Sequence, residues 1–374
     1  MKKFLVITMA LLLVLVTLAG CGGGGGGAPA ESNGGGEATT TAPPAATGNE
    51  DMYISVISKG FQHQFWQAVK AGSDQAAADY GVTITFDGPE GESAIADQVT
   101  MINAALAKLP NAIALAALST EAVLPQLQEA YDLGIPVIGF DSGVPDAPAG
   151  QVAATASTNN EAAAALGAEK MFEAIQGEVA GATAANPVVI CVLSQDVTSA
   201  SITGRTKGFA EKMFELASGA NADGAAITGG FAAINNGDAG SAAVIIEVVV
   251  GATTDITDMT NAANGLLNTD NLLGVFCSNE GAVNGLLAAI NAGSRVPDGV
   301  KLVGFDAGSA QKEAVRNGTF LGSVTQDPFQ IGYKAVELAV KAANGEPVSD
   351  VDTGAQWYNA DNIDNPDIAI LVYD

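Results

Sequence analysis

Apolar and polar positions along residues 52–359 follow two alternating periods, which predict successive strands and helices. Residues 52–58, MYISVIS, predict a buried strand that ends in a Ser-Lys-Gly turn. Apolar residues then recur at helical spacing on one face of residues 65–76, and residues 82–86 predict a second strand. A strand–helix–strand unit predicts a parallel sheet with a crevice beyond the carboxyl ends of its strands. We expect this crevice to hold Ser58, Lys59, His63, Phe65 and Trp66.

The same alternation continues through the chain and is repeated in its second half. In the first half, the further expected strands are 112–116, 135–140 and 151–156, and the expected helices are 93–108, 121–133 and a long helix from residue 161. In the second half, the expected strands are 187–193, 243–250, 272–277 and 300–305, and the expected helices are 206–217, 258–267 and 281–291. Residues 218–241 have weak periodicity and are expected to form a loop or an insertion.

The end of the chain is expected to connect the two halves. Residues 318–325 and 351–359 predict strands that cross between them, and residues 328–343 predict a helix that rejoins the first half. A further crossing is expected where the long helix begins. The sequence therefore predicts an α/β fold with two doubly wound parallel-sheet domains.

The first 50 residues differ in composition from the rest. Met-Lys-Lys precedes an uncharged apolar run at 4–18, and Leu18-Ala19-Gly20-Cys21 follows. This pattern resembles a bacterial lipoprotein signal peptide over residues 1–20, with Cys21 as the lipidated residue. The alternatives are a plain secretory signal or an uncleaved anchor. Residues 21–50 begin with six consecutive glycines after Cys21 and predict a flexible linker to an extracytoplasmic, membrane-anchored body.

Charge and residue counts exclude several classes of function. The net charge is −26, and removal of the first 20 residues would remove two lysines and no acidic residue. An acidic body argues against nucleic-acid binding and against anionic lipid surfaces. Cys191 and Cys277 lie in apolar strands and are expected to be buried free thiols, the alternative being a disulfide. The single histidine, His63, argues against a Cys/His zinc site, and we expect neither metal nor cofactor.

Six motifs occur in a characteristic order: HQFW, VIGFDSGV, RTKGF, FCSNEGA, VGFDAG and VTQDPFQIGYKAVE. Together they resemble the ribose/galactose-type periplasmic sugar-binding proteins, the type I substrate-binding components of ABC transporters. The resemblance implies two lobes joined by a three-strand hinge, with a sugar bound between them. It implies an N-terminal lobe of residues 52–157 plus 327–354, and a C-terminal lobe of residues 158–326 plus 355–374.

The resemblance also implies a ligand site. Its expected members are Ser58, His63, Phe65, Trp66, Asp141, Ser142, Arg205, Thr254, Asn279, Asp306 and Gln326. In this family, aromatic rings cover the sugar faces while charged and amide groups bind the hydroxyls, which suits a polyhydroxylated ring. Several positions depart from the ribose pattern. Ser142 replaces an arginine, and Thr254 replaces an aromatic residue. Lys59, Gly60 and His63 also differ, with one residue inserted. The identity of the sugar therefore cannot be carried over.

Each candidate also has a structural interpretation. Phe65 could belong to the core, His63 could cap a helix, and Asp141 and Asp306 could be turn residues. The leading hypothesis is a monomeric, membrane-tethered receptor that delivers a monosaccharide-like ligand to an ABC permease. One alternative is a ligand-sensing subunit for a chemoreceptor or sensor kinase. Another is a cleft enzyme that acts on a glycoside, with Asp141, Asp306 and His63 as its acid/base group.

Overall fold

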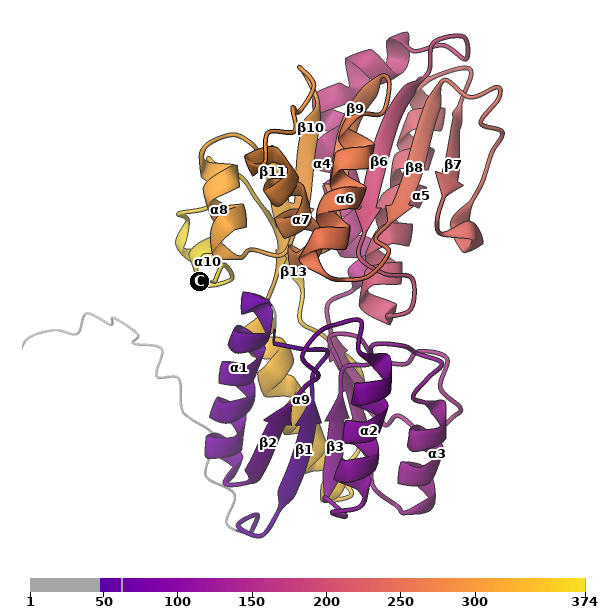
Figure 1. Ribbon diagram of the computed structural model, residues 1–374. Helices are drawn as coiled ribbons and strands as arrows, with labels where there is room; N and C mark the ends of the chain where they lie inside the picture. Colours follow the sequence, from indigo (N-terminus) through magenta and orange to yellow (C-terminus); the bar gives the residue numbers. More distant parts are fainter. Residues whose placement is uncertain (1–47, 62, 374) are drawn as a thin grey trace, which may run out of the picture. The chain divides into compact units, whose positions relative to one another are not determined.

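Two sheets organise the part of the chain that the structure describes, residues 48–61 and 63–373 of a computed structural model (Figure 1). The expectations for the signal peptide, for Cys21 and for residues 21–47 of the linker lie outside these residues. Strands and helices alternate as the sequence predicts, and both sheets are almost entirely parallel. The predicted α/β fold with two doubly wound sheets is thus confirmed.

The first sheet has six parallel strands in the order β12-β5-β4-β3-β1-β2. The strands are β1 (Tyr53–Ile57), β2 (Thr83–Asp87), β3 (Ala112–Leu115), β4 (Val137–Phe140), β5 (Ala154–Ser157) and β12 (Val351–Asp352). Helices α1 (Gln64–Tyr80) and α9 (Pro328–Ala343) pack on one face, and α2 (Ile95–Leu106) and α3 (Leu124–Asp132) pack on the other. We call this sheet and these helices the first lobe.

The second sheet has seven strands in the order β13-β11-β10-β9-β6-β8-β7. The strands are β6 (Val188–Ser194), β7 (Ala225–Gly229), β8 (Val244–Val250), β9 (Leu272–Cys277), β10 (Lys301–Phe305), β11 (Gly322–Gln326) and β13 (Ala355–Tyr358). One face carries α4 (Asn160–Gly181) and α5 (Ala200–Ala220), and the other carries α6 (Ile256–Leu267), α7 (Glu280–Asn291) and α8 (Ser309–Arg316). We call this sheet and these helices the second lobe.

The chain passes between the lobes at three places: from β5 to α4, from β11 to α9, and from β12 to β13. The last passage corrects the expectation of one strand over residues 351–359. Gly354 has a φ of 78°, in the left-handed region, and there the extended chain leaves one sheet for the other. β12 pairs in parallel with β5, whereas β13 pairs antiparallel with β11.

Other departures from the sequence expectations are local. The expected loop at 218–241 contains the edge strand β7, which pairs with β8, and a short 3₁₀ turn at Ala232–Ile234. Helices α8 and α10 (Pro366–Ala369) were not expected. Cys191 and Cys277 are free and buried, as predicted. Within the described residues, no helix combines the length and apolar character that crossing a membrane requires.

Two glycines let α9 lie directly against α1 in the first lobe. A Cβ atom at Gly72 would come within 1.9 Å of the carbonyl oxygen of Phe329, and one at Gly332 within 1.9 Å of that of Val69. No larger side chain fits at either position without moving a helix. This close crossing holds α9, which begins where the chain returns from the second lobe, against α1. The first turn of α1 carries the candidate site residues Phe65 and Trp66.

Candidate ligand-binding site

The carboxyl ends of strands from both sheets converge on one cavity. It contains about 250 Å³ of empty space, part of which is open to solvent. Its lining residues are Lys59, His63, Phe65, Trp66, Glu92, Asp141, Ile202, Arg205, Asn279, Glu280, Asp306 and Gln326. This is the crevice expected beyond the strand ends, and both lobes supply its polar groups.

Asp141 and Asp306 occupy equivalent positions in the two lobes. Each directly follows a strand that ends in Gly-Phe, β4 for Asp141 and β10 for Asp306. Their φ angles are 52° and 77°, in the left-handed region that residues with a Cβ atom seldom adopt. Strained backbone of this kind is concentrated at functional sites, so the simple turn interpretation of these aspartates is the weaker one.

Arg205 is held from several sides and lies between the two aspartates. Its Nε donates to Asn160 Oδ1 at 2.7 Å, and its guanidinium lies 4.0 Å from the centroid of the Phe305 ring. Its terminal nitrogens are 3.7 Å from Asp141 Oδ1 and 3.5 Å from Asp306 Oδ2. Arg205 and Asp141 belong to different lobes, so this ion pair crosses the interface between them.

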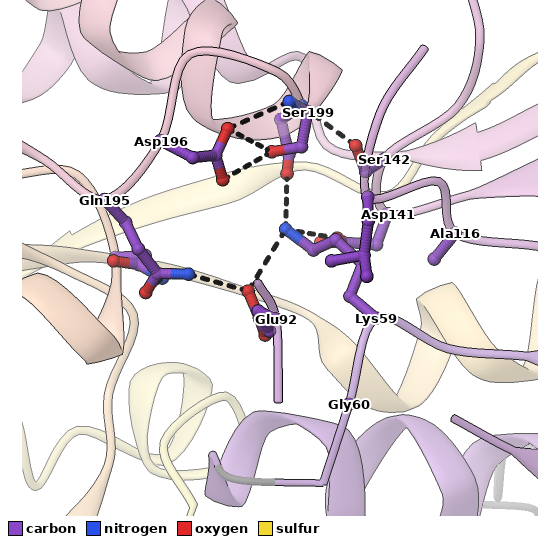
Figure 2. A network of polar contacts seen from close by, with 12 residues as sticks. Lys59, Gly60, Glu92, Ala116, Asp141, Ser142, Gln195, Asp196 and Ser199 are labelled. Atoms are coloured by element: carbon purple, nitrogen blue, oxygen red, sulfur yellow. Dashed lines mark hydrogen bonds and ion pairs between the residues drawn. The ribbon is translucent and has the colours of Figure 1, made fainter. Parts of the chain in front are cut away.

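Lys59 and Glu92 form the centre of a second cluster (Figure 2). Lys59 Nζ donates to Ser201 Oγ at 3.2 Å and lies 3.6 Å from Glu92 Oε2 and 3.8 Å from Asp141 Oδ2. Burial alone would lower the pKa of Lys59, but the charges of Glu92 and Asp141 outweigh it and raise that pKa. The ammonium group is therefore charged although it is almost fully buried.

Asp306, Asn279 and Gln326 form a third group, in the second lobe. Asp306 Oδ1 accepts from Gln326 Nε2 at 2.7 Å, and Asp306 Oδ2 accepts from the backbone N–H of Glu280 at 3.0 Å. Asn279 Oδ1 caps α7. Gln326 Oε1 and His63 Nε2 are buried and have no hydrogen-bond partner among the described residues. Buried polar atoms without partners are costly, so these two atoms mark places for ligand groups.

Two aromatic residues, Phe65 and Trp66, belong both to the hydrophobic core of the first lobe and to the lining of the cavity. Phe65 and Trp66 are 5% and 1% exposed, and their rings meet edge to face with centroids 5.0 Å apart. Trp66 Nε1 donates to Glu92 Oε1 at 2.7 Å. Both side chains line the cavity, so burial in the core does not remove them from the site.

Eight residues of the expected set line this cavity: His63, Phe65, Trp66, Asp141, Arg205, Asn279, Asp306 and Gln326. Three do not. Ser58 Oγ donates to backbone carbonyls of Gly60 and Asp87, Ser142 Oγ accepts from the backbone N–H of Ser201, and Thr254 Oγ1 is buried elsewhere without a partner among the described residues.

Four lining residues were absent from the expected set: Lys59, Glu92, Ile202 and Glu280. Lys59 was expected in the crevice, because it lies in the turn after the first strand, but it was not part of the set that the family resemblance implies. Glu280 could have been inferred, because it directly follows the expected residue Asn279. Glu92 had no signal in the sequence. It lies in a loop that also contains Glu90, and no periodicity distinguishes the two glutamates.

The comparisons with known proteins agree with this geometry. A family model described as a periplasmic binding protein domain matches residues 54–347. The chain is 24% identical over 317 residues to the D-allose-binding periplasmic protein of Escherichia coli (strain K12), a match that covers 83% of this chain and 90% of the relative. It is 36% identical to a ribose import binding protein of Salmonella typhimurium over 74 residues, 20% of this chain and 24% of the relative.

Solved structures are similar over most of the chain. One is an ABC transporter protein from Brachyspira murdochii, described as a LacI family transcriptional regulator, with 42% identity and a TM-score of 0.72 over 86% of this chain and 99% of that one. Another is an ABC transporter solute-binding protein from Agrobacterium vitis with bound D-fucose, with 28% identity and a TM-score of 0.71 over 86% of this chain and all of that one.

Proposed function

The chain belongs to the periplasmic binding protein family, and we propose that it is an extracytoplasmic receptor that binds a monosaccharide-like ligand between its lobes and delivers it to an ABC permease. Of the similar proteins described above, those with a named ligand bind D-allose, ribose or D-fucose. All are binding or transport proteins, which supports a receptor that releases its ligand unchanged.

The observation that carries the proposal is the spacing of the buried charges. Asp141 lies 3.8 Å from Lys59 and 3.7 Å from Arg205, and Arg205 lies 3.5 Å from Asp306. These separations exceed ordinary hydrogen-bond lengths for charged groups. A hydroxyl both donates and accepts, so a ligand hydroxyl can donate to a carboxylate and accept from a cation.

The remaining lining groups suit the rest of a sugar ring. Phe65 and Trp66 offer apolar surface for C–H groups, and the unpartnered Gln326 Oε1 can accept from a further hydroxyl. The cavity is small, which favours a single-ring ligand over an oligosaccharide.

Closure of the lobes around the ligand is part of the proposal. Three chain passages join the lobes, and contacts such as Lys59–Ser201 and Arg205–Asp141 run between them. Such a hinge lets a ligand stabilise the closed form, which the permease would recognise. The signal peptide at 1–20, the lipidated Cys21, the linker, the residue boundaries of the two lobes and the monomeric state remain proposals from the sequence.

Calorimetric titration of the mature protein with a panel of neutral monosaccharides and polyols tests this function. We expect at least one ligand to bind, and Asp141→Asn to weaken it at least about tenfold, because a hydrogen bond to a charged group contributes about 1.5–3 kcal/mol. Asp146→Asn, an exposed aspartate in the same loop, is the matched control. Binding heat for none of these compounds, or chemical conversion of the bound sugar, would contradict the proposal.

A further inference from the structure

Glu92 lies in the loop between β2 and α2, and its buried carboxylate contacts four side chains. Glu92 Oε1 accepts from Trp66 Nε1 at 2.7 Å, and Oε2 accepts from Gln195 Nε2 at 2.8 Å. Lys59 Nζ lies 3.6 Å from Oε2, and His63 Nε2 lies 3.7 Å from Oε1. Figure 2 shows the carboxylate between Lys59 and Gln195.

Glu92 also joins the two lobes. Gln195 directly follows β6 in the second lobe, and its Oε1 accepts from Asn279 Nδ2 at 2.5 Å. The carboxylate of Glu92 thus connects Trp66 in the first lobe, through Gln195, to the residue that caps α7. The cavity therefore depends on Glu92 for the orientation of groups in both lobes.

The charge of Glu92 offsets the cation that an acidic ligand would need. Two permanent cations, Lys59 and Arg205, line the cavity together with four carboxylates. Lys59 is surrounded by the carboxylates of Glu92 and Asp141, and the charge of Asp196 also acts on it. A ligand carboxylate that approached Lys59 would meet these acidic groups, which repel it.

We propose that Glu92 is a specificity-determining residue that makes this cavity select neutral over anionic sugars, by neutralising Lys59 and by fixing the indole of Trp66. This inference rests on the proposed function, because it concerns ligands of the same cavity. The protonation state of Glu92 is consistent with it. Burial alone would raise the pKa of Glu92, but the charges of Lys59 and His63 and two hydrogen bonds lower it to about 2.

Matched sugars that differ at one carbon, and there in charge, provide the test. D-Galactose and D-galacturonate, D-glucose and D-glucuronate, and D-ribose and D-riburonate each differ by oxidation of the terminal CH₂OH group to a carboxylate. For the pair whose neutral member binds the wild type most tightly, we expect Glu92→Gln to reduce the preference for that member by about tenfold or more. Glu90→Gln, an exposed change of the same charge in the same loop, should leave the preference unchanged.

A second variant separates charge from loss of structure. In Lys59→Met/Glu92→Gln both charges are removed, so the anionic sugar loses its cation and the preference for the neutral sugar should return. If Glu92→Gln weakened both members of the pair equally, or if the double variant kept the relaxed preference, the selectivity role would be refuted. Circular dichroism of each variant establishes that it is folded.

Fluorescence of the ligand-free protein tests the positioning of Trp66 without any sugar. In a Trp357→Phe background, Trp66 is the remaining tryptophan. We expect Glu92→Gln to shift its emission, because the indole N–H then donates to a neutral amide oxygen, while Glu90→Gln leaves the emission unchanged. An unchanged spectrum would refute the positioning role. If the wild type bound no compound of the neutral panel that tests the proposed function, that function would fail, and this spectrum alone would decide whether Glu92 positions Trp66.

Discussion

Glu280→Gln should weaken ligand binding without destabilising the ligand-free protein. Glu280 is the first residue of α7 in the second lobe, and its two carboxylate oxygens accept from the backbone N–H groups of Gln64 and Phe65, each at 3.2 Å. These are the first residues of α1 in the first lobe. The N-cap residue His63 makes no capping hydrogen bond through its side chain, so α1 takes this cap from the opposite lobe.

A second contact between the lobes runs in the opposite direction. Gln64 Oε1 accepts from the backbone N–H of Ser309 at 2.8 Å and from its hydroxyl at 2.9 Å, at the start of α8. Glutamine at position 280 would keep one accepting oxygen and lose the charge, so one bond is lost and the other is weakened. With about 1.5–3 kcal/mol for a bond to a charged group, we expect the closed form to lose about 2 kcal/mol. That loss corresponds to roughly thirtyfold weaker binding.

The assay compares calorimetric affinity with calorimetric unfolding of the ligand-free protein. If the lobes separate without ligand, the Glu280 contacts are absent from that state, and its melting temperature should be unchanged. Glu346→Gln, an exposed glutamate outside the cavity lining, is the control. Affinity within about threefold of the wild type would refute this reasoning. An equal loss of stability in the ligand-free protein would show instead that the contact does not depend on closure.

Three further predictions concern stability and reactivity. Gly72→Ala should destabilise the protein by about 1–3 kcal/mol in urea unfolding, because its Cβ would overlap α9, whereas Gly177→Ala, which meets nothing within 4 Å, should stabilise it by about 0.5–1 kcal/mol. Burial alone would raise the pKa of Glu92, but Lys59 and the other groups that contact it lower it from 4.5 to about 2. Ionised Glu92 therefore stabilises the fold above pH 4.5, and this stabilisation is lost as the pH falls from 4.5 through about 2. Between these pH values, Glu92→Gln should therefore lose less stability than the wild type does. Burial raises the pKa of the Cys277 thiol, and that of Cys191 to about 12, so peptide mapping after alkylation at about pH 8 should find both unmodified until the protein unfolds.

The fold was largely predictable because many of its inner strands are buried on both faces. A buried parallel strand such as β6, VVICVLS, is a continuous apolar run between polar turns, and such runs are visible without an alignment. β7, AAITG, was not recognised because it is a short edge strand rich in small residues, and only its pairing with β8 identifies it. The division of residues 351–359 depends on Gly354, and an extended run does not reveal which sheet each part joins.

From the chain pattern alone, the site was predictable mainly where a residue follows a strand end. Asp141 and Asp306 could be placed in this way, because carboxyl ends of parallel strands meet at one edge of a sheet. Arg205, in contrast, lies within α5 and was expected only from the family resemblance. Ser142 is adjacent to Asp141 in sequence, but its hydroxyl accepts from the backbone N–H of Ser201 and does not line the cavity. Glu92 acquires its role from groups distant in sequence, including Gln195 in the other lobe, which a local pattern cannot indicate.

The buried charges explain how the same residues can cost stability and supply affinity. Burial is the largest contribution to the raised pKa of Asp141, and the charges of Lys59 and Arg205 do not offset it. No hydrogen bond reaches this carboxylate from the side chains that the structure describes, and its two ion pairs are 3.7 and 3.8 Å long. For Asp141, ion pairs of this length do not recover the cost of desolvation. A ligand hydroxyl that donates to Asp141 supplies the missing hydrogen bond, so binding energy arises where the unliganded cavity leaves the charge poorly compensated.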